Sequence, residues 1–367
     1  MNTQIQDTFT FKNGQTMRNR VVLAPMTICA SEPGGYVSQA DIDFFARRSR
    51  SVGMAITGST YVHPLGKSFA ESFSGAEDDK IEGLSRLAKA IKDQGALAIV
   101  QLYHGGRMVL PDLIDGQPVA PSAVKAPRDY LAEPRALKNS EVEQVIEDFL
   151  SAIRRAIQAG FDGVELHGAN TYLIQQFVSP HSNVRQDKWG GSLNNRLRFP
   201  KTLLKRAKQL VKEEADRPFL IGYRFSPEEI EEPGIQLYDT LQLLEQLIYH
   251  QVDYLHISTS DVWRSSIRDS QDSEPVIQKI IRKINDRVPL IGVGQIETKQ
   301  DAQRVLDAGI SLFALGKALL LDPDWAEKVV SGREAEVIRA YRDELQADLA
   351  LPTAFVEDAR SYLEGKD

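Results

Sequence analysis

Short apolar runs recur along the chain and alternate with charged segments in which apolar residues repeat every three to four positions. Runs of this kind are typical of strands buried on both faces, and the longer repeat is typical of helices that bury one face. The runs predict strands at Val21–Pro25, Met54–Thr57, Ala96–Leu102, Gly163–His167, Phe219–Tyr223, Tyr254–Ile257, Leu290–Val293 and Leu312–Leu315. Helices are predicted at Ile81–Ala90, Glu141–Ala159, Leu193–Glu213, Thr240–Tyr249, Val276–Ile284 and Lys299–Ala308.

Strands that alternate with helices indicate an α/β fold with a parallel sheet. A single (β/α)8 TIM barrel is the simplest way to close eight such units. An open, doubly wound sheet shares the alternation and is the competing architecture. The first strand is not followed by the glycine fingerprint of dinucleotide-binding sheets, which favours the barrel. We predict a barrel over residues 1–332 and a charged, helical C-terminal extension over residues 333–367 that packs on the barrel.

Two connections are longer than a strand–helix turn requires. They are Gly105–Ser140, which is rich in Pro and polar residues, and Asn170–Leu193. Both follow predicted strands, so both lie at the carboxyl face of the barrel, where active sites of this fold are found. Long loops inside a compact domain are usually functional, and we expect these two to cap a binding site.

Charge and cysteine content narrow the class of function. Lys and Arg number 44 against 51 Asp and Glu, a net charge of −7, which lacks the basic excess that nucleic acid requires. Cys29 is the only cysteine, so an internal disulfide, a Cys-ligated iron–sulfur cluster and a structural zinc site are excluded. Redox chemistry would therefore need an organic cofactor or a lone metal.

The chain also lacks the patterns that mark export or membrane insertion. The segment Met1–Phe11 has no basic region followed by an apolar core, so we expect no signal peptide. No stretch approaches the roughly 18 apolar residues of a membrane span. We expect a cytoplasmic protein with no membrane and no nucleic-acid partner. The sequence leaves open whether the chain forms a homo-oligomer.

Polar residues follow the predicted strands at the end where a barrel gathers them into one cavity. They are Met26-Thr27, Gly58-Ser59-Thr60, Gln101 with Tyr103-His104, His167 through Tyr172, Arg224, Ser258-Thr259, Gly292-Val293-Gly294 and Gly316-Lys317. The set lacks the two close carboxylates of a glycosidase and the histidine spacing of a metallohydrolase. We predict no metal site.

The last two predicted strands end in glycine-containing turns, at Gly294 and Gly316. Glycines let backbone N–H groups approach phosphate oxygens, and loops after the seventh and eighth strands form the recurrent phosphate site of barrels. Packing glycines at tight turns are the alternative at either strand alone. Their occurrence at both expected strands favours a phosphate.

His167, Asn170 and Tyr172 lie just beyond a predicted strand. A neutral histidine and an asparagine amide can both donate to one carbonyl oxygen, while a phenol can deliver a proton nearby. Spacing alone equally allows a histidine satisfied by the backbone, with Asn170 and Tyr172 shaping the turn.

Two further polar residues interrupt apolar strands. Arg224 requires an anionic partner if it is buried, either a ligand or an internal glutamate such as Glu165. Gln101 either hydrogen-bonds a polar ligand edge or is satisfied by a neighbouring strand. The residues themselves leave both alternatives open.

Longer blocks carry a family resemblance. They are Arg18–Thr27 (RNRVVLAPMT), Gln101–Arg107 (QLYHGGR), Gly160–Tyr172 (GFDGVELHGANTY), Phe177–Asn183 (FVSPHSN), Gly190–Phe199 (GGSLNNRLRF) and Leu315–Trp325 (LGKALLLDPDW). In these blocks the chain resembles the old yellow enzyme family of FMN-dependent ene-reductases, also described as NADH:flavin oxidoreductases. The blocks follow the family order over most of the chain.

The resemblance implies an eight-stranded barrel that holds FMN noncovalently at its carboxyl end. The residues that it assigns to the flavin ring are Ala24, Pro25, Met26, Thr27, Ser59, Gln101 at the pyrimidine edge, His167, and Arg224 beside N1. Those that it assigns to the phosphate are Val293, Gly294, Leu315, Gly316 and Lys317.

The resemblance further implies ping-pong hydride transfer. NADH or NADPH reduces the flavin and leaves, and a small electrophile such as an α,β-unsaturated carbonyl compound takes its place. His167 and Asn170 would polarise the carbonyl, Tyr172 would supply a proton to the α-carbon, and Tyr103 would line the substrate pocket. The catalytic residues are thus expected to be Tyr172, His167 and Asn170.

Two departures from the family pattern limit which residue roles can be assigned to this chain. Some relatives carry a redox-tuning cysteine where this chain has Thr27, and Cys29 lies two positions further on, so that role is not assigned to it. Lys317 stands where the family usually has arginine, and lysine lacks the planar fork that grips a phosphate. The alternatives are a flavin-binding redox protein or sensor with little turnover, and a dienoyl-thioester reductase-like enzyme.

Overall fold

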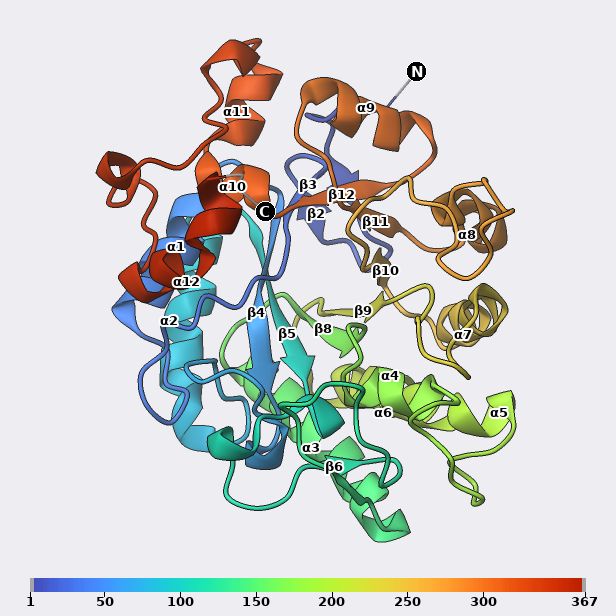
Figure 1. The fold of residues 1–367 in the computed structure, drawn as a ribbon. Coiled ribbons are helices and arrows are strands. Elements are labelled where there is room, and N and C mark those ends of the chain that lie inside the picture. Colours follow the sequence, from blue (N-terminus) through green and yellow to red (C-terminus); the bar gives the residue numbers. More distant parts are fainter. Residues whose placement is uncertain (1–2, 365–367) are drawn as a thin grey trace.

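The computed structural model of the chain describes residues 3–364 and contains a closed barrel of eight parallel strands (Figure 1). The strands are β3 (Val21–Leu23), β4 (Met54–Tyr61), β5 (Leu97–Tyr103), β8 (Gly163–Gly168), β9 (Leu220–Phe225), β10 (Tyr254–Ile257), β11 (Leu290–Val293) and β12 (Leu312–Leu315). They neighbour one another in chain order, and β9 pairs with β10 and β12 with β3. The predicted TIM barrel is confirmed, and each predicted strand is present.

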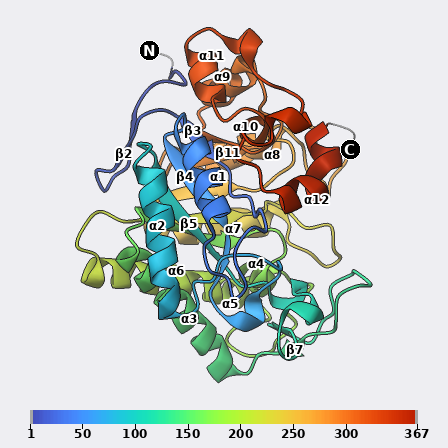
Figure 2. The same ribbon diagram turned by 90° about the vertical axis from the view of Figure 1, so that its left-hand side faces the viewer.

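Helices surround the barrel (Figures 1 and 2). They are α1 (Gln39–Ser49), α2 (Ile81–Lys92), α3 (Asn139–Gln158), α4 (Leu173–Val178), α5 (Leu193–Arg196), α6 (Arg198–Glu214), α7 (Leu237–Tyr249), α8 (Val276–Ile284), α9 (Lys299–Asp307), α10 (Lys317–Leu321), α11 (Trp325–Val330) and α12 (Thr353–Glu364). Helices α1, α4, α10 and α11 were not predicted, and the single helix expected over Leu193–Glu213 is divided at Leu197. Ser38 begins α1 with a capping box, in which its hydroxyl accepts from the Asp41 N–H at 3.1 Å.

The amino-terminal end of the barrel is closed by a hairpin of β1 (Phe9–Thr10) and β2 (Thr16–Met17). Phe11 and Met17 are buried in the same cluster as barrel residues such as Ile99 and Ile291. The cluster fills this end of the barrel with apolar side chains. The polar strand-end residues therefore lie at the other, carboxyl end.

The two long connections are joined to each other at the carboxyl face. The Arg185 guanidinium donates to the Pro121 carbonyl at 2.7 Å, and the Val184 N–H donates to the Ser122 hydroxyl at 3.0 Å. The first connection contains the short parallel pair β6 (Val119–Ala120) and β7 (Arg135–Ala136). The second was expected to be a loop but contains helix α4. In Figure 1 the first connection, with β6, lies beyond the end of β5, and the expected role of both connections as a cap over a binding site stays a prediction.

The C-terminal segment is less helical than predicted. Between α11 and α12 it forms only single 3-10 turns at Glu334–Glu336 and Asp343–Leu345. Helix α12 lies beside α10 (Figures 1 and 2), with Val356 and Leu363 buried. The division of the chain at residue 332 stays a prediction, and the ends of both predicted domains, residues 1–2 and 365–367, lie outside the described residues.

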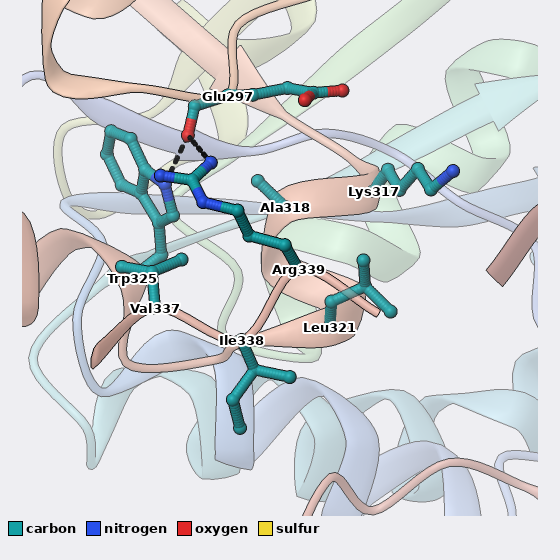
Figure 3. A pocket seen from close by; sticks show the side chains of 8 residues that line it. All are labelled: Glu297, Lys317, Ala318, Leu321, Trp325, Val337, Ile338 and Arg339. Atoms are coloured by element: carbon teal, nitrogen blue, oxygen red, sulfur yellow. Dashed lines mark hydrogen bonds between the residues drawn. The ribbon is translucent and has the colours of Figure 1, made fainter. Parts of the chain in front are cut away.

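A small pocket of about 90 Å³ shows how this segment is attached (Figure 3). The Glu297 carbonyl accepts from Trp325 Nε1 at 2.9 Å and from the Arg339 guanidinium at 3.4 Å. These bonds connect the loop after β11 to α11 and to the C-terminal segment, while the Lys317 side chain points away from Trp325 (Figure 3). No helix among residues 3–364 is long and apolar enough to cross a membrane.

The close packing of the barrel interior predicts the effect of a glycine substitution. A Cβ at Gly222 in β9 would overlap the Tyr254 ring, whereas one at Gly292 in β11 would have its nearest neighbours 3.4 Å away. We expect Gly222→Ala to lower the free energy of unfolding by about 1–3 kcal/mol, the usual cost of overpacking. Chemical denaturation followed by circular dichroism measures this change, and Gly292→Ala is the matched control. Equal effects of both variants would contradict the packing described here.

Candidate active site

A cavity of about 400 Å³ opens at the carboxyl ends of β11 and β12. Its lining includes the five residues expected to hold a phosphate, Val293, Gly294, Leu315, Gly316 and Lys317. Gly294 has a φ of +109°, and a Cβ there would lie 2.7 Å from the backbone of Ser260 and Asp261. Glycine is therefore required at this position, where the chain passes close to the loop after β10.

The same cavity contains residues that sequence reasoning missed. Ser260, Gln295 and Tyr362 line it, together with Thr259, which had been noted at a strand end without a role. Tyr362 comes from α12, and its ring lies 4.7 Å from the Lys317 ammonium, within cation–π distance. No local motif pointed to Tyr362, because only the folded chain brings it to β12.

The segment after β3 lies between the ends of β12 and β4. The Ala24 N–H donates to the Leu315 carbonyl at 3.0 Å, and the Thr27 hydroxyl accepts from the Ser59 N–H at 3.1 Å. The ladder between β4 and β5 shifts between Ile56 and Ser59, and a Cβ at Gly58 would lie 2.6 Å from the Met26 carbonyl oxygen. The bulge thus holds Met26 and Thr27 against the barrel rim. Pro25 connects them to Ala24, which is hydrogen-bonded to the end of β12.

Gln101 is buried and is satisfied by neighbouring strands. Its Nε2 donates to Glu165 at 2.8 Å, and its Oε1 accepts from the Ser59 hydroxyl at 3.3 Å. Of the two alternatives for Gln101, the structure shows the one in which neighbouring strands satisfy the side chain. A carbonyl oxygen keeps a second lone pair, so this does not prevent Oε1 from accepting from a ligand as well.

Arg224 is half-buried and lacks a full set of partners. Its Nε has no hydrogen-bond partner among residues 3–364. Burial lowers the pKa of the guanidinium, and attraction from Glu165 opposes that effect. Since an unpaired buried donor is costly, Arg224 is suited to meet an acceptor or an anion from a ligand.

His167 lies at the end of β8, where its tautomer is determined by the backbone. Its Nδ1 accepts from the Ala169 N–H at 3.3 Å, so the ring proton resides on Nε2. Burial lowers the pKa of His167 well below its usual value, with help from Arg224 and His256. His167 is therefore a neutral donor at physiological pH.

A tight turn through Asn170 and Thr171 brings Tyr172 back beside His167. Asn170 and Thr171 have φ values of +56° and +63°, two successive left-handed residues without a glycine. The Ser258 hydroxyl donates to Asn170 Oδ1 at 2.8 Å, which leaves the Nδ2 hydrogens to donate elsewhere. Strained backbone of this kind persists where the surroundings hold it, often at functional sites.

Tyr172 completes an aromatic group at the mouth. Its ring centroid lies 5.0 Å from His167, 5.2 Å from Tyr103 and 6.4 Å from Phe69, which was not predicted. Burial raises the pKa of Tyr172 to about 12, so the phenol keeps its proton. The Tyr103 oxygen accepts from the Ser68 N–H at 2.9 Å and is thereby held in place.

These features suit a flavin mononucleotide. The glycine-lined cavity with Lys317 provides a cradle for a phosphate, and Arg224 offers an unpaired donor at the carboxyl end of β9. Ladder pairs join Gln101 to Glu165 and Arg224 to His167 on adjacent strands, so the polar groups occupy one end of the barrel.

Comparison with known proteins also indicates a flavin-dependent oxidoreductase. The chain belongs to the NADH:flavin oxidoreductase / NADH oxidase family, whose sequence model matches residues 6–336. This is a family of FMN-dependent enzymes that take electrons from NADH or NADPH, as the resemblance implied.

Relatives within the family differ in their acceptors. The chain is 47% identical to an NADH:fumarate oxidoreductase of Klebsiella pneumoniae over 92% of its own length and 37% of that protein. It is 44% identical to an NADH:acrylate oxidoreductase of Vibrio harveyi, of which it spans 36%. It is also 44% identical to a probable NADH-dependent flavin oxidoreductase of Bacillus subtilis, YqiG, of which it spans 88%. The chain thus covers little more than a third of the first two relatives.

Solved structures show the same barrel. An old yellow enzyme homologue from Zymomonas mobilis superimposes with a TM-score of 0.78 at 27% identity, covering 90% of this chain and 93% of that one. Morphinone reductase gives a TM-score of 0.80 at 25% identity, covering 97% and 93%.

The geometry of His167 predicts a binding defect. Phenolates are stable mimics of an acceptor oxygen that carries negative charge, and His167 Nε2–H can donate to them. We expect His167→Ala to keep the yellow FMN spectrum but to bind 4-hydroxybenzaldehyde at least about tenfold more weakly, since a hydrogen bond to a charged group contributes about 1.5–3 kcal/mol. Absorbance titration measures the dissociation constant, and His250→Ala on the surface of the barrel is the control. Unchanged affinity in His167→Ala would remove His167 from the oxygen-binding role.

Proposed function

We propose that this chain transfers a hydride from NADH or NADPH, by way of bound FMN, to the electron-poor C=C bond of an α,β-unsaturated carbonyl compound or a related electrophile. The observation that carries the proposal is the turn after β8. In it the neutral imidazole of His167 lies 5.0 Å from the ring of Tyr172, a protonated phenol, and the Ser258 hydroxyl occupies Asn170 Oδ1, so that the Asn170 amide hydrogens are available to donate.

In this proposal the cavity of β11 and β12 holds the FMN phosphate through backbone N–H groups and Lys317. Ala24 through Thr27 and Ser59 contact the ring system, together with His167. Gln101 hydrogen-bonds its pyrimidine edge, and Arg224 places positive charge beside it. Bound FMN supplies the hydride acceptor and donor, which this chain's side chains lack.

The protein's own groups act on the second substrate. His167 Nε2–H and the Asn170 amide donate to its carbonyl oxygen and stabilise the negative charge that develops there. Tyr172 gives its phenolic proton to the α-carbon, and Tyr103 with Phe69 limits the space at the mouth. Because His167 is neutral, it donates without taking a charge of its own into the buried site.

A second candidate function follows from the lengths of the relatives. The region shared with this chain occurs in enzymes named for fumarate and for acrylate, and in shorter relatives named for the flavin or nicotinamide alone. What these names share is NAD(P)H oxidation. The chain would then serve as a flavin-binding redox unit that passes electrons to a partner and has little ene-reductase turnover of its own.

Two half-reactions separate these candidates. Anaerobic mixing with NADH or NADPH should bleach the flavin absorbance of the holoprotein under both. Subsequent addition of cyclohexenone, fumarate or acrylate should restore the colour within the turnover time only if the chain reduces alkenes itself. Recovery with ferricyanide but with none of the alkenes would support the electron-transfer unit, and a protein that binds no flavin would overturn both.

The position of Tyr172 predicts a selective defect. Tyr172→Phe keeps the ring but removes the proton, so flavin reduction by NAD(P)H should remain within about twofold of wild type. Reoxidation by cyclohexenone should slow by about 10²-fold, the lower range for general acid catalysis. Stopped-flow absorbance measures both steps, with Tyr238→Phe on the exposed face of α7 as control. Equal losses in both half-reactions would rule out Tyr172 as the proton donor.

The raised pKa of Tyr172 predicts a pH dependence of the same step. A phenol with a pKa of about 12 stays protonated, and so remains a donor, at all lower pH values. An ordinary tyrosine would lose its proton near pH 10. We expect the rate of flavin reoxidation by cyclohexenone to stay constant up to about pH 10.5. A fall centred near pH 10 would contradict the buried environment of the phenol.

A further inference from the structure

Beneath the proposed flavin site lies a buried row of hydrogen-bonded side chains that leads from Gln101 to Glu165 and His256, two residues that have no part in the proposed function. Gln101 Nε2 donates to Glu165 Oε1 at 2.8 Å, and His256 Nδ1 lies 2.9 Å from Glu165 Oε2. None of the three residues is more than 1% exposed. A carboxylate in the interior of a barrel is expensive and requires an explanation.

The backbone register explains how Glu165 reaches both partners. Gln101 in β5 is its ladder partner on one side, and Gly222 in β9 is its ladder partner on the other. Gly222 has no side chain, so Glu165 can extend across β9 to His256 in β10. The ring of Tyr254 in β10 occupies the remaining space above Gly222, and burial together with Glu165 raises the pKa of this tyrosine well above its usual value, so its phenol is neutral.

Charged and titratable groups face this row from each of the strands packed against it. Arg224 in β9 is the ladder partner of both His167 in β8 and His256 in β10. Burial pushes the pKa of Glu165 up, but His256 and Arg224 bring it below its ordinary value, so the carboxylate is ionised. Burial lowers the pKa of His256, and Glu165 opposes that shift, so the ring is neutral with its proton on Nδ1.

The row therefore contains one negative charge that faces the single positive charge of Arg224. It also sets the direction of the Gln101 amide. With Nε2 bound to the carboxylate, Oε1 is turned towards the Ser59 hydroxyl in β4, from which it accepts a hydrogen bond at 3.3 Å. His256 Nε2 and Arg224 Nε have no hydrogen-bond partners among residues 3–364, so the row is not arranged for stability alone.

We infer that Glu165 is a positioning residue that orients the Gln101 carbonyl towards FMN and offsets the charge of Arg224, and so keeps the reduction potential of the bound FMN low. The inference rests on the flavin placement given under the proposed function. Reduction adds negative charge to the pyrimidine edge of a flavin. A nearby cation favours that charge, and an anion that compensates the cation weakens the effect. A lower potential makes the reduced flavin a stronger donor to poor acceptors.

The test is the midpoint potential of the FMN holoprotein, measured by anaerobic spectroelectrochemistry. Glu165→Gln removes the charge and keeps the shape, and it should favour the reduced flavin by at least about tenfold, which is about 30 mV for a two-electron couple. Glu165→Asp keeps the charge but shortens the reach. It should leave the potential close to wild type while weakening FMN binding, measured by flavin fluorescence.

Asp253→Asn is the matched control. It removes a carboxylate at the opposite end of the barrel, where Asp253 accepts from the Ile221 N–H at 2.7 Å just before β10 begins. Its potential should equal that of wild type. A Glu165→Gln potential equal to wild type, or an equal shift in Asp253→Asn, would overturn the inference while leaving the proposed function intact. A wild-type protein that binds no FMN would instead overturn the proposed function.

If Glu165→Gln does not fold, His256→Phe provides the same test. Phenylalanine fills a similar volume but removes one of the two donors to the carboxylate, so the pKa of Glu165 rises. Protonation would then remove the charge at a higher pH than in wild type, and the variant's potential should exceed that of wild type increasingly as the pH is lowered. A difference that does not grow at any pH at which the holoprotein stays folded would contradict the role of the Glu165 charge.

Discussion

The register of the parallel ladder is the constraint on which the site depends. Along β8, β9 and β10 it sets His167 opposite Arg224 and Arg224 opposite His256. A shift of one residue in any strand would turn the inward side chains outwards, because side chains alternate along a strand. The apolar hairpin plug at the amino end and the close contact between Gly222 and Tyr254 both resist such a shift. Apolar packing at the amino-terminal end of the barrel thus fixes the positions of the polar side chains at the carboxyl end.

Features with a short-range signal were predictable from the sequence. Apolar runs located every barrel strand, since a strand buried on both faces needs no partner sequence to be recognised. The glycines after β11 and β12 were found because barrels place phosphate sites there, and the structure gathers the five predicted residues around one cavity. The roles assigned to them, and to His167, Asn170 and Tyr172, remain proposals that the geometry supports.

Features that depend on contacts far apart in the chain were missed. In helix α1 charged residues stand on both sides of the buried pair Phe44 and Phe45 and leave no clear apolar repeat, and the interruption at Leu197 falls inside a continuous helical pattern. Tyr362 reaches the cavity only because α12 packs beside α10. Glu165 was considered as an ion-pair partner of Arg224, but its oxygens bind Gln101 and His256. Glu165 reaches His256 because its ladder partner in β9 is Gly222, which has no side chain, and only the strand register reveals this.

The buried row also explains why, in the proposed function, the flavin environment depends on the barrel strands more than the acceptor site does. Gln101, Glu165 and Arg224 belong to the barrel strands themselves, so the environment proposed for the flavin is built into the fold. In the proposed function the acceptor meets Tyr103 at the very end of β5 and, outside the strands, Tyr172 and Phe69, of which Phe69 comes from the segment between β4 and α2. Loop residues of this kind can change without disturbing the ladder. In the proposed function, a barrel that keeps its strand-borne charges can therefore retain NAD(P)H oxidation while its rim is adapted to different acceptors, such as the fumarate and the acrylate for which two relatives are named.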